Sequence, residues 1–135
     1  MAKCTTQVRK AGTELVAAGY CLYSMATVFV ITLGSGVYEF TLDRGIGEFV
    51  LSDSAMRIPD PGQRIYSGNE GNTALWDPDL AAYLDTLKAT EGGAKPYSYR
   101  YIGALVGDFH RVLKYGGFWA YPGDKKATSG KARLL

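Results

Sequence analysis

Short apolar and β-branched blocks, separated by turns that contain glycine, occupy the first half of the chain. Residues 27–32 (TVFVIT) are β-branched and aromatic, residues 37–42 (VYEFTL) alternate between apolar and polar side chains, and residues 48–52 (EFVLS) have a similar character. The turns lie at residues 34–36 (GSG) and 43–45 (DRG). Because β-branched blocks joined by short turns are typical of antiparallel strands, we expect a three-stranded β-meander here.

A separate apolar block precedes the meander. Residues 15–18 (LVAA) are consecutive apolar residues, and Thr13 is a residue type that caps helix N-termini. A segment that is apolar on every side indicates a buried helix. We therefore expect a short helix from Thr13 to about Tyr23, preceded by a polar tail over residues 1–11.

Helical periodicity appears in the second half, after a connector over residues 54–63 and a short strand at residues 65–67 (IYS). Asp77 is followed by Pro78, a combination of cap and first-turn proline that opens helices. The apolar positions that follow have the spacing of one helix face: Leu80, Tyr83, Leu84 and Leu87. Residues 92–93 (GG) are expected to end this helix.

A second amphipathic helix is predicted over residues 104–114. Its expected buried face consists of Leu105, Phe109, Val112 and Leu113. Residues 117–122 (GFWAYP) are then predicted to form a buried strand, and residues 125–131 a basic loop.

Composition excludes disorder, because 47% of the 135 residues are hydrophobic and 21% are charged. The net charge is only +2, but from Arg100 to the end seven Lys and Arg face two Asp. Such a local excess suggests an anionic ligand, which is a phosphate, a nucleic acid or an acidic membrane surface.

Several classes of site have no signature in the sequence. There is no nucleophile elbow, P-loop, dinucleotide fingerprint or Cys/His metal cluster. His110 lies between core positions of a predicted helix and is interpreted as structural. Cys4 and Cys21 fit no redox spacing, and Cys21 is expected to be a buried thiol in a reducing compartment.

No membrane segment is expected. The longest apolar stretch, around residues 28–33, is far shorter than the roughly 20 residues that cross a bilayer, and the N-terminus lacks a signal-peptide pattern. The expected location is cytoplasmic, with an organelle left open.

Three places have side chains suited to phosphate oxygens. Tyr121 ends a predicted strand, and Lys131 lies in the basic loop that follows. Arg100 and Tyr101 precede a helix whose first amides, near Gly103, can receive an anion. Asn69 lies in a polar turn. On composition alone, a solvated loop, a surface arginine and a plain turn remain open alternatives.

Read together, these motifs resemble the class I fructose-1,6-bisphosphatases from about residue 12 to the end. The matching runs share the order and spacing of that family: VAAGY at 16–20, FTLD at 40–43, GEF at 47–49, YSGNEG at 66–71, RYIG at 100–103, Asp108, HR at 110–111, YGG at 115–117, YP at 121–122, KK at 125–126, GK at 130–131 and RLL at 133–135. Departures from the pattern occur at Asn72, at residues 104–105 (AL), at residues 118–120 (FWA) and at residues 127–129 (ATS).

The resemblance implies magnesium-assisted hydrolysis of fructose 1,6-bisphosphate to fructose 6-phosphate and phosphate, a gluconeogenic step. It also implies residue roles. The 6-phosphate and the sugar would be held by Asn69, Tyr101, Tyr121 and Lys131. Arg100 would reach into the 6-phosphate site of a neighbouring subunit in the family's tetramer, and the backbone near Gly103 would line the sugar.

The fold implied by the resemblance is α/β, as part of the layered sugar-phosphatase fold. Residues 12–57 would be the end of an N-terminal sheet subdomain, whose meander is left incomplete. Residues 58–135 would be a C-terminal sugar-phosphate-binding subdomain, truncated at its end, with a mixed sheet flanked by helices. An exposed sheet edge, apolar patches and poor stability are therefore expected.

Three functional interpretations remain open. The chain is a portion of a fructose bisphosphatase whose Mg²⁺ ligands lie outside it, so that alone it is inactive. Alternatively, it is a truncated paralogue that binds sugar phosphates or joins the family's oligomers without turnover. A nucleic-acid binder is disfavoured, because the basic residues coincide with phosphate-ligand positions and no aromatic stacking surface is evident.

Overall fold

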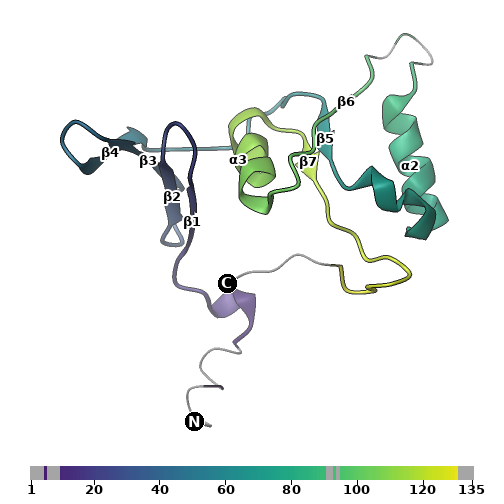
Figure 1. Cartoon of the computed structure of the whole chain (residues 1–135), viewed down its shortest axis with the longest axis horizontal. Helices are drawn as coiled ribbons and strands as arrows, with labels where there is room; N and C mark the ends of the chain where they lie inside the picture. Colours follow the sequence, from purple (N-terminus) through teal and green to yellow (C-terminus); the bar gives the residue numbers. More distant parts are fainter. Residues whose placement is uncertain (1–4, 6–9, 91–92, 94, 131–135) are drawn as a thin grey trace. The chain divides into compact units, whose positions relative to one another are not determined.

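The structure is a computed structural model, and it describes residue 5 and residues 10–90, 93 and 95–130 (Figure 1). The chain divides into two compact units, Met1–Arg57 and Ile58–Leu135. Each unit contains a sheet of its own. Within the described ranges, no helix is both long enough and apolar enough to span a bilayer.

The first unit is an antiparallel meander with strand order β1-β2-β3-β4. The expected strands are confirmed, and the sheet contains one strand more than expected. Its elements are the 3-10 turn η1 (Gly12–Glu14) and the strands β1 (Ala18–Leu22), β2 (Val28–Thr32), β3 (Tyr38–Asp43) and β4 (Glu48–Asp53).

The additional strand corrects the expectation of a helix over residues 13–23. After the turn at Gly12–Glu14, the chain extends and pairs with β2 along the whole of Ala18–Leu22. Gly19 permits this pairing, because a Cβ there would lie 2.8 Å from the carbonyl oxygen of Val30. An apolar run has no decisive periodicity, so the hydrogen-bonding edge of β2 determined its conformation.

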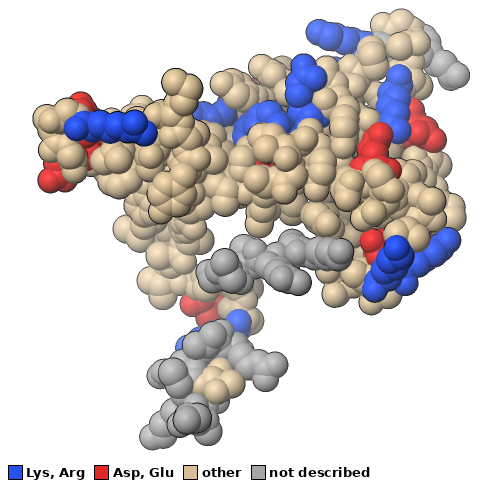
Figure 2. All heavy atoms as spheres, in the orientation of Figure 1, with Lys and Arg blue, Asp and Glu red and all other residues tan. Residues whose placement is uncertain are grey.

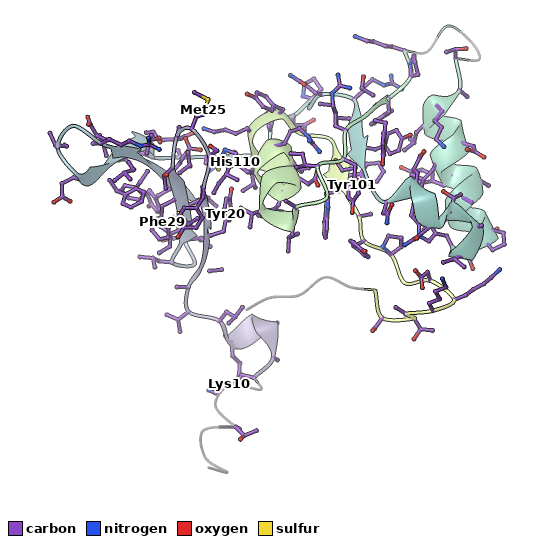
Figure 3. All side chains as sticks on the ribbon, viewed as in Figure 1. Lys10, Tyr20, Met25, Phe29, Tyr101 and His110 are labelled. Atoms are coloured by element: carbon purple, nitrogen blue, oxygen red, sulfur yellow. The ribbon has the colours of Figure 1, made fainter. Side chains whose placement is uncertain are left out.

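Much of the apolar surface of this meander is exposed, as expected. Val30 and Met56 are buried, whereas the consecutive β4 residues 49–51 (FVL) are each more than 40% exposed. Since neighbours in a strand point to opposite faces, both faces of β4 present apolar side chains. Phe29 lies among the aromatic side chains of this sheet (Figure 3). Cys21 is only half-buried, which corrects the expected burial of its thiol.

The second unit has a small sheet with strand order β6-β5-β7, in which both strand pairs are parallel. The described strands therefore differ from the expected mixed sheet, and the strand expected at residues 117–122 is shorter. The elements of this unit are β5 (Ile65–Ser67), η2 (Glu70–Leu75), α2 (Pro78–Lys88), β6 (Ser98–Tyr99), α3 (Leu105–Tyr115) and β7 (Phe118–Trp119).

Helix α2 begins as the sequence predicts and packs on this sheet. The Asp77 carboxylate caps it by accepting a hydrogen bond from the Asp79 amide at 2.9 Å. The core cluster contains Tyr66, Trp76 and Leu84, with Leu80, Leu87, Tyr97 and Phe118 packed against it. The helix ends at Lys88, before the predicted glycine pair. The Leu87 carbonyl accepts a hydrogen bond from the Tyr97 amide at 2.9 Å, because the chain returns past the end of the helix. Tyr83, which shares the predicted apolar face, is 53% exposed.

Helix α3 buries only part of the predicted face, since Val112 is buried and Leu105 and Leu113 are half-buried. Phe109 is 42% exposed, while Asp108 is completely buried together with Val112. A buried carboxylate is tolerated only when its oxygens are hydrogen-bonded or paired with a cation. The partners of Asp108 are therefore central to this unit.

A close backbone approach joins the end of α3 to β5. Gly117 has a φ of +82°, and a Cβ there would clash with the carbonyl group of Ile65. The Gln63 amide also donates to the Tyr115 carbonyl at 2.7 Å. The chain therefore enters β7 alongside β5 only because residue 117 has no side chain.

We predict that Gly117→Ala destabilises the second unit by more than about 3 kcal/mol, since it combines an unfavourable φ with overpacking against a backbone carbonyl. Gly93→Ala is the matched control, because Gly93 also has a positive φ (+77°) but no atom within 4 Å of its Cβ position. It should cost only about 1–2 kcal/mol. Thermal unfolding followed by circular dichroism would contradict this if the two variants melted together.

Candidate functional site

The predicted binding residues follow the ends of three neighbouring strands. Because β5 is parallel to both β6 and β7, the carboxyl ends of all three lie at one edge of the sheet. Asn69 comes two residues after β5, Arg100 and Tyr101 come directly after β6, and Tyr121 comes two residues after β7. In α/β proteins, ligands bind at such edges.

Backbone hydrogen bonds hold these segments in register beyond the strands. The Arg100 amide donates to the Tyr66 carbonyl at 3.0 Å, and the Ala120 amide donates to the Ser67 carbonyl at 3.0 Å. Gly103 follows in the same segment with a φ of +82°. Four of the predicted side chains are thus brought to one edge, with Gly103 just beyond it. Lys131 lies outside the described residues.

The buried carboxylate of Asp108 organises the segment after β6. It lies in the first turn of α3 and accepts hydrogen bonds from the Ile102 amide at 3.1 Å and the Gly103 amide at 3.2 Å. A carboxylate near a helix N-terminus is also stabilised by the helix dipole. The path of the chain from Tyr101 to Gly103 is consequently determined by one acidic side chain.

Arg111, one helical turn later, joins this carboxylate to the other segments. Its Nη2 atom donates to Asp108 Oδ1 at 2.6 Å, to the Arg100 carbonyl at 2.7 Å and to Ser67 Oγ at 2.5 Å. Ser67 is the last residue of β5. One guanidinium therefore connects α3 to two of the strand ends that have candidate ligands.

Two of the candidate side chains, Tyr101 and Arg100, remain available as hydrogen-bond donors. Loss of hydration raises the pKa of Tyr101, and the nearby groups of Tyr121, Asp108 and Tyr99 raise this pKa further. Its hydroxyl is therefore protonated at neutral pH. Arg100 is exposed, and its guanidinium donates to the Tyr99 carbonyl at 3.1 Å. Exposed basic side chains lie on the surface of the molecule in Figure 2.

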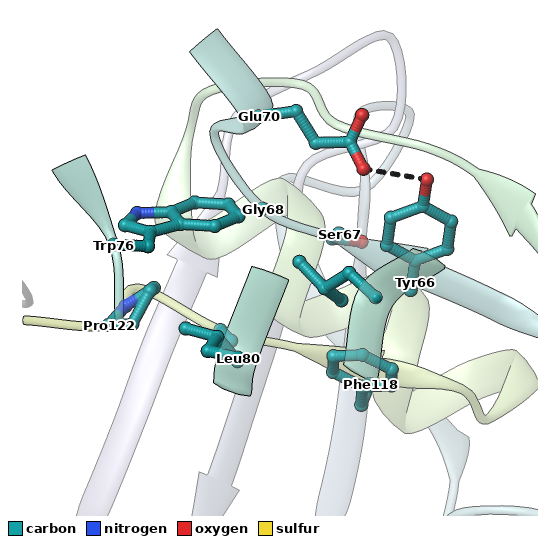
Figure 4. A pocket seen from close by; sticks show the side chains of 10 residues that line it. Tyr66, Ser67, Gly68, Glu70, Trp76, Leu80, Phe118 and Pro122 are labelled. Atoms are coloured by element: carbon teal, nitrogen blue, oxygen red, sulfur yellow. Dashed lines mark hydrogen bonds between the residues drawn. The ribbon is translucent and has the colours of Figure 1, made fainter. Parts of the chain in front are cut away.

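A small cavity in this unit is distinct from the open edge. Its volume is about 20 Å³, which suffices for one water molecule but not for a sugar phosphate. The lining is mostly apolar and includes Trp76, Leu80 and Phe118 (Figure 4). Beside it, the Tyr66 hydroxyl donates to Glu70 at 2.8 Å. The cavity is part of the hydrophobic core rather than a ligand site.

Sequence reasoning assigned no role to Asp108 or Arg111. Both lie in matched motifs, but their charges resemble those of an ordinary surface pair on a helix. The available signal is their spacing, because residues three apart on a helix face each other. Their burial is the feature that separates them from such a pair.

The candidate residues do not fit a magnesium ion. Mg²⁺ takes oxygen ligands, carboxylates above all, whereas the candidate side chains are mainly nitrogen and hydroxyl donors. Among the residues that the structure describes, no group of three or more His, Cys, Asp or Glu could hold a metal.

The fold and this edge define an α/β protein of the layered sugar-phosphatase class. A family model described as "Fructose-1-6-bisphosphatase, C-terminal domain" matches residues 58–135, and the corresponding N-terminal domain model matches residues 2–54. The chain therefore belongs to the fructose-1,6-bisphosphatase family, as its motifs predict.

Similar proteins include enzymes from plants and a parasite. The chloroplastic fructose-1,6-bisphosphatase of Oryza sativa subsp. indica is 55% identical over 133 residues, which is 98% of this chain and 32% of that protein. The chloroplastic enzyme of Spinacia oleracea is 54% identical with the same coverage. The Leishmania major enzyme in holo form has a TM-score of 0.90 and 46% identity, covering 99% of this chain and 41% of that one. The chain thus spans about a third of the length of the curated relatives it matches.

We predict that Asp108→Ala lowers the stability of the second unit by about 3–5 kcal/mol, because it leaves the buried Arg111 charge without its carboxylate. Asp85→Ala is the matched control: Asp85 pairs with Lys88 at the same spacing, but its side chain is 77% exposed. That variant should lose less than about 1 kcal/mol. Urea unfolding monitored by tryptophan fluorescence measures both, and equal losses would refute the special role of Asp108.

Proposed function

We propose that the chain supplies the sugar-phosphate-binding side of a fructose-1,6-bisphosphatase, which converts fructose 1,6-bisphosphate and water to fructose 6-phosphate and phosphate. The observation that carries the proposal is the convergence of Asn69, Arg100, Tyr101 and Tyr121 at one edge of a parallel sheet. The family membership and the chemistry of these side chains support the same assignment.

In this proposal, Asn69, Tyr101, Tyr121 and Lys131 hold the 6-phosphate and the sugar. The amide and the two hydroxyls donate directional hydrogen bonds, and the ammonium group adds a charge-assisted one, which is about twice as strong as a neutral bond. The backbone at Gly103 lines the sugar. Its position follows from the hydrogen bond between its amide and Asp108.

Arg100 has a separate role in the proposal: it grips the 6-phosphate of a neighbouring subunit in a homotetramer. The exposure of its side chain supports this role, since a guanidinium that serves a neighbour must reach outward. Arginine suits the task because its fork of donors matches phosphate oxygens. In a closed symmetric assembly, every site would receive one such arginine.

Magnesium enters the proposal as the family's cofactor, held by residues other than the candidate set. Its chemistry would be to stabilise charge on the phosphoryl oxygens and to activate water at the 1-phosphate. The side chains of this chain would bind and orient the distal end of the substrate. Binding energy from such a remote group contributes to the rate by positioning the reacting end.

A second candidate function is a sugar-phosphate-binding or oligomer-joining module without turnover. The specific observation in its favour is the state of Asp108, the carboxylate that holds the segment after β6. Its oxygens already accept hydrogen bonds from Arg111 and from the Ile102 and Gly103 amides. Its role is therefore to stabilise the fold. The candidate side chains then provide binding groups, while Asp108 is not available as an acid–base group.

We further propose that the two units are the end of the family's N-terminal sheet subdomain, over residues 12–57, and its C-terminal sugar-phosphate-binding subdomain, over residues 58–135. The boundaries of the two compact units and of the family models support this division. We propose a plastid as the compartment in place of the cytoplasm, because the named plant relatives are chloroplastic. Microscopy of a fluorescent fusion tests the location.

We predict that the chain binds fructose 6-phosphate and that Lys131→Ala weakens this binding by about 10-fold or more, because a charge-assisted hydrogen bond is lost. Lys95→Ala is the control, since Lys95 is exposed and lies outside the candidate set. Isothermal titration calorimetry at fixed ionic strength measures both affinities. Equal affinities for the native chain and Lys131→Ala would show that Lys131 makes no main contact with the phosphate.

We also predict that the purified 135-residue chain releases no phosphate from fructose 1,6-bisphosphate, with or without Mg²⁺. The reason is that its candidate residues bind the distal phosphate and do not fit the metal. A colorimetric phosphate assay over a range of Mg²⁺ concentrations measures this. Magnesium-dependent release would show that the chain contains the catalytic groups itself.

A further inference from the structure

Asn69 occupies an unusual local position for a binding residue. It is the N-cap of η2, with φ −80° and ψ 82°, yet its side chain makes no capping hydrogen bond. Its Oδ1 atom would lie 3.3 Å from a Cβ at position 71, where the chain has glycine. The amide is therefore left for another partner, and its orientation depends on what holds the residues on either side.

On the downstream side, the next residue is held by its carboxylate. Glu70 Oε1 accepts a hydrogen bond from the Tyr66 hydroxyl at 2.8 Å, and Lys88 Nζ lies 3.0 Å from the same oxygen. Tyr66 is only 3% exposed, whereas the Lys88 side chain is 39% exposed. Because exposed ion pairs contribute little, the Tyr66 bond is the main restraint on the Glu70 carboxylate.

On the upstream side, the preceding residue is held by its carbonyl. The Tyr99 hydroxyl donates to the Gly68 carbonyl at 2.8 Å. The Tyr99 and Tyr66 rings pack with centroids 5.3 Å apart, and the two residues pair across β6 and β5. Two neighbouring tyrosines thus restrain the two residues that flank Asn69.

We propose that Tyr66, Glu70 and Tyr99, called here the Asn69 clamp, are positioning residues for the sugar-phosphate site. None of them touches the ligand in this proposal. They hold the backbone on both sides of Asn69, so that its free amide is oriented before the ligand arrives. Preorganisation of this kind improves affinity, because the side chain loses its conformational entropy during folding and not on binding. The inference rests on the proposed function of Asn69.

The protonation states of the clamp suit this role at neutral pH. Burial, followed by the hydrogen bond to Glu70, raises the pKa of Tyr66 to about 12. The Tyr66 hydroxyl therefore keeps its proton and donates throughout the physiological range. Hydrogen bonding to Glu70 likewise raises the pKa of Lys88, which keeps a positive charge beside the carboxylate.

The decisive variant is Tyr99→Phe, because it keeps the ring and removes only the hydroxyl that holds Gly68. Tyr83→Phe is the matched control: its ring also packs in this unit, 6.5 Å from that of Phe118, but the residue is 53% exposed and lies outside the clamp. Both variants are compared with the native chain for thermal stability, so that a general loss of folding is recognised. Glu70→Gln provides a second clamp variant that keeps an acceptor for Tyr66.

The first measurement needs no ligand. The Asn72 amide donates to the Asn69 carbonyl at 3.0 Å, so its hydrogen exchange reports how firmly Asn69 is held. We expect exchange at Asn72 to be at least about 5-fold faster in Tyr99→Phe than in Tyr83→Phe, as a lost hydrogen bond of ordinary strength implies. Equal exchange rates in the two variants would overturn the clamp, whatever the protein binds.

The second measurement is a double-mutant cycle on fructose 6-phosphate affinity. Tyr99→Phe should raise the Kd about 5-fold in the native background and leave it unchanged in an Asn69→Ala background, because the hydroxyl acts through Asn69. Equal effects in both backgrounds would make Tyr99 merely structural and overturn the inference. A native chain that shows Asn72 protection but binds no fructose 6-phosphate would overturn the proposed function and leave the clamp as a folding feature alone.

Discussion

The second unit depends on the buried pair between Asp108 and Arg111. A carboxylate with no exposed surface is stable only because two backbone amides and a guanidinium surround it. Arg111 of this pair also links α3 to the end of β5 and to the segment after β6. The sheet itself is small, with strands of two or three residues. Side-chain hydrogen bonds at its edge therefore hold the strand ends together, because the backbone ladders between the strands are short.

This arrangement explains how so small a sheet presents a precise edge. Asp108 restrains the Arg100–Gly103 region, Arg111 connects it to Ser67, and the tyrosines of β5 and β6 restrain the turn around Asn69. Asn69, Arg100 and Tyr101 thus each lie within one or two residues of a restrained atom. Functional side chains held by a rigid surrounding shell lose less entropy on binding than side chains in free loops.

The first unit has a different character. Its meander is regular, but apolar side chains such as Phe49 and Leu51 are exposed, and few residues are buried. The strands pair through local hairpins, so the sheet forms from contacts between neighbours in the sequence. Several apolar side chains of the meander are therefore exposed in this chain, which spans about a third of the length of its relatives.

The sequence by itself determined the family, the meander strands, the start of α2 and the strand that precedes Asn69. These features are local: alternation, turn glycines and the Asp77-Pro78 start act within a few residues. Only the tertiary structure decided that residues 18–22 extend as a strand, that Phe109 is exposed and that Asp108 is buried. These outcomes depend on partners distant in sequence, such as the edge of β2 for Gly19 and Ser67 for Arg111, which no local pattern specifies.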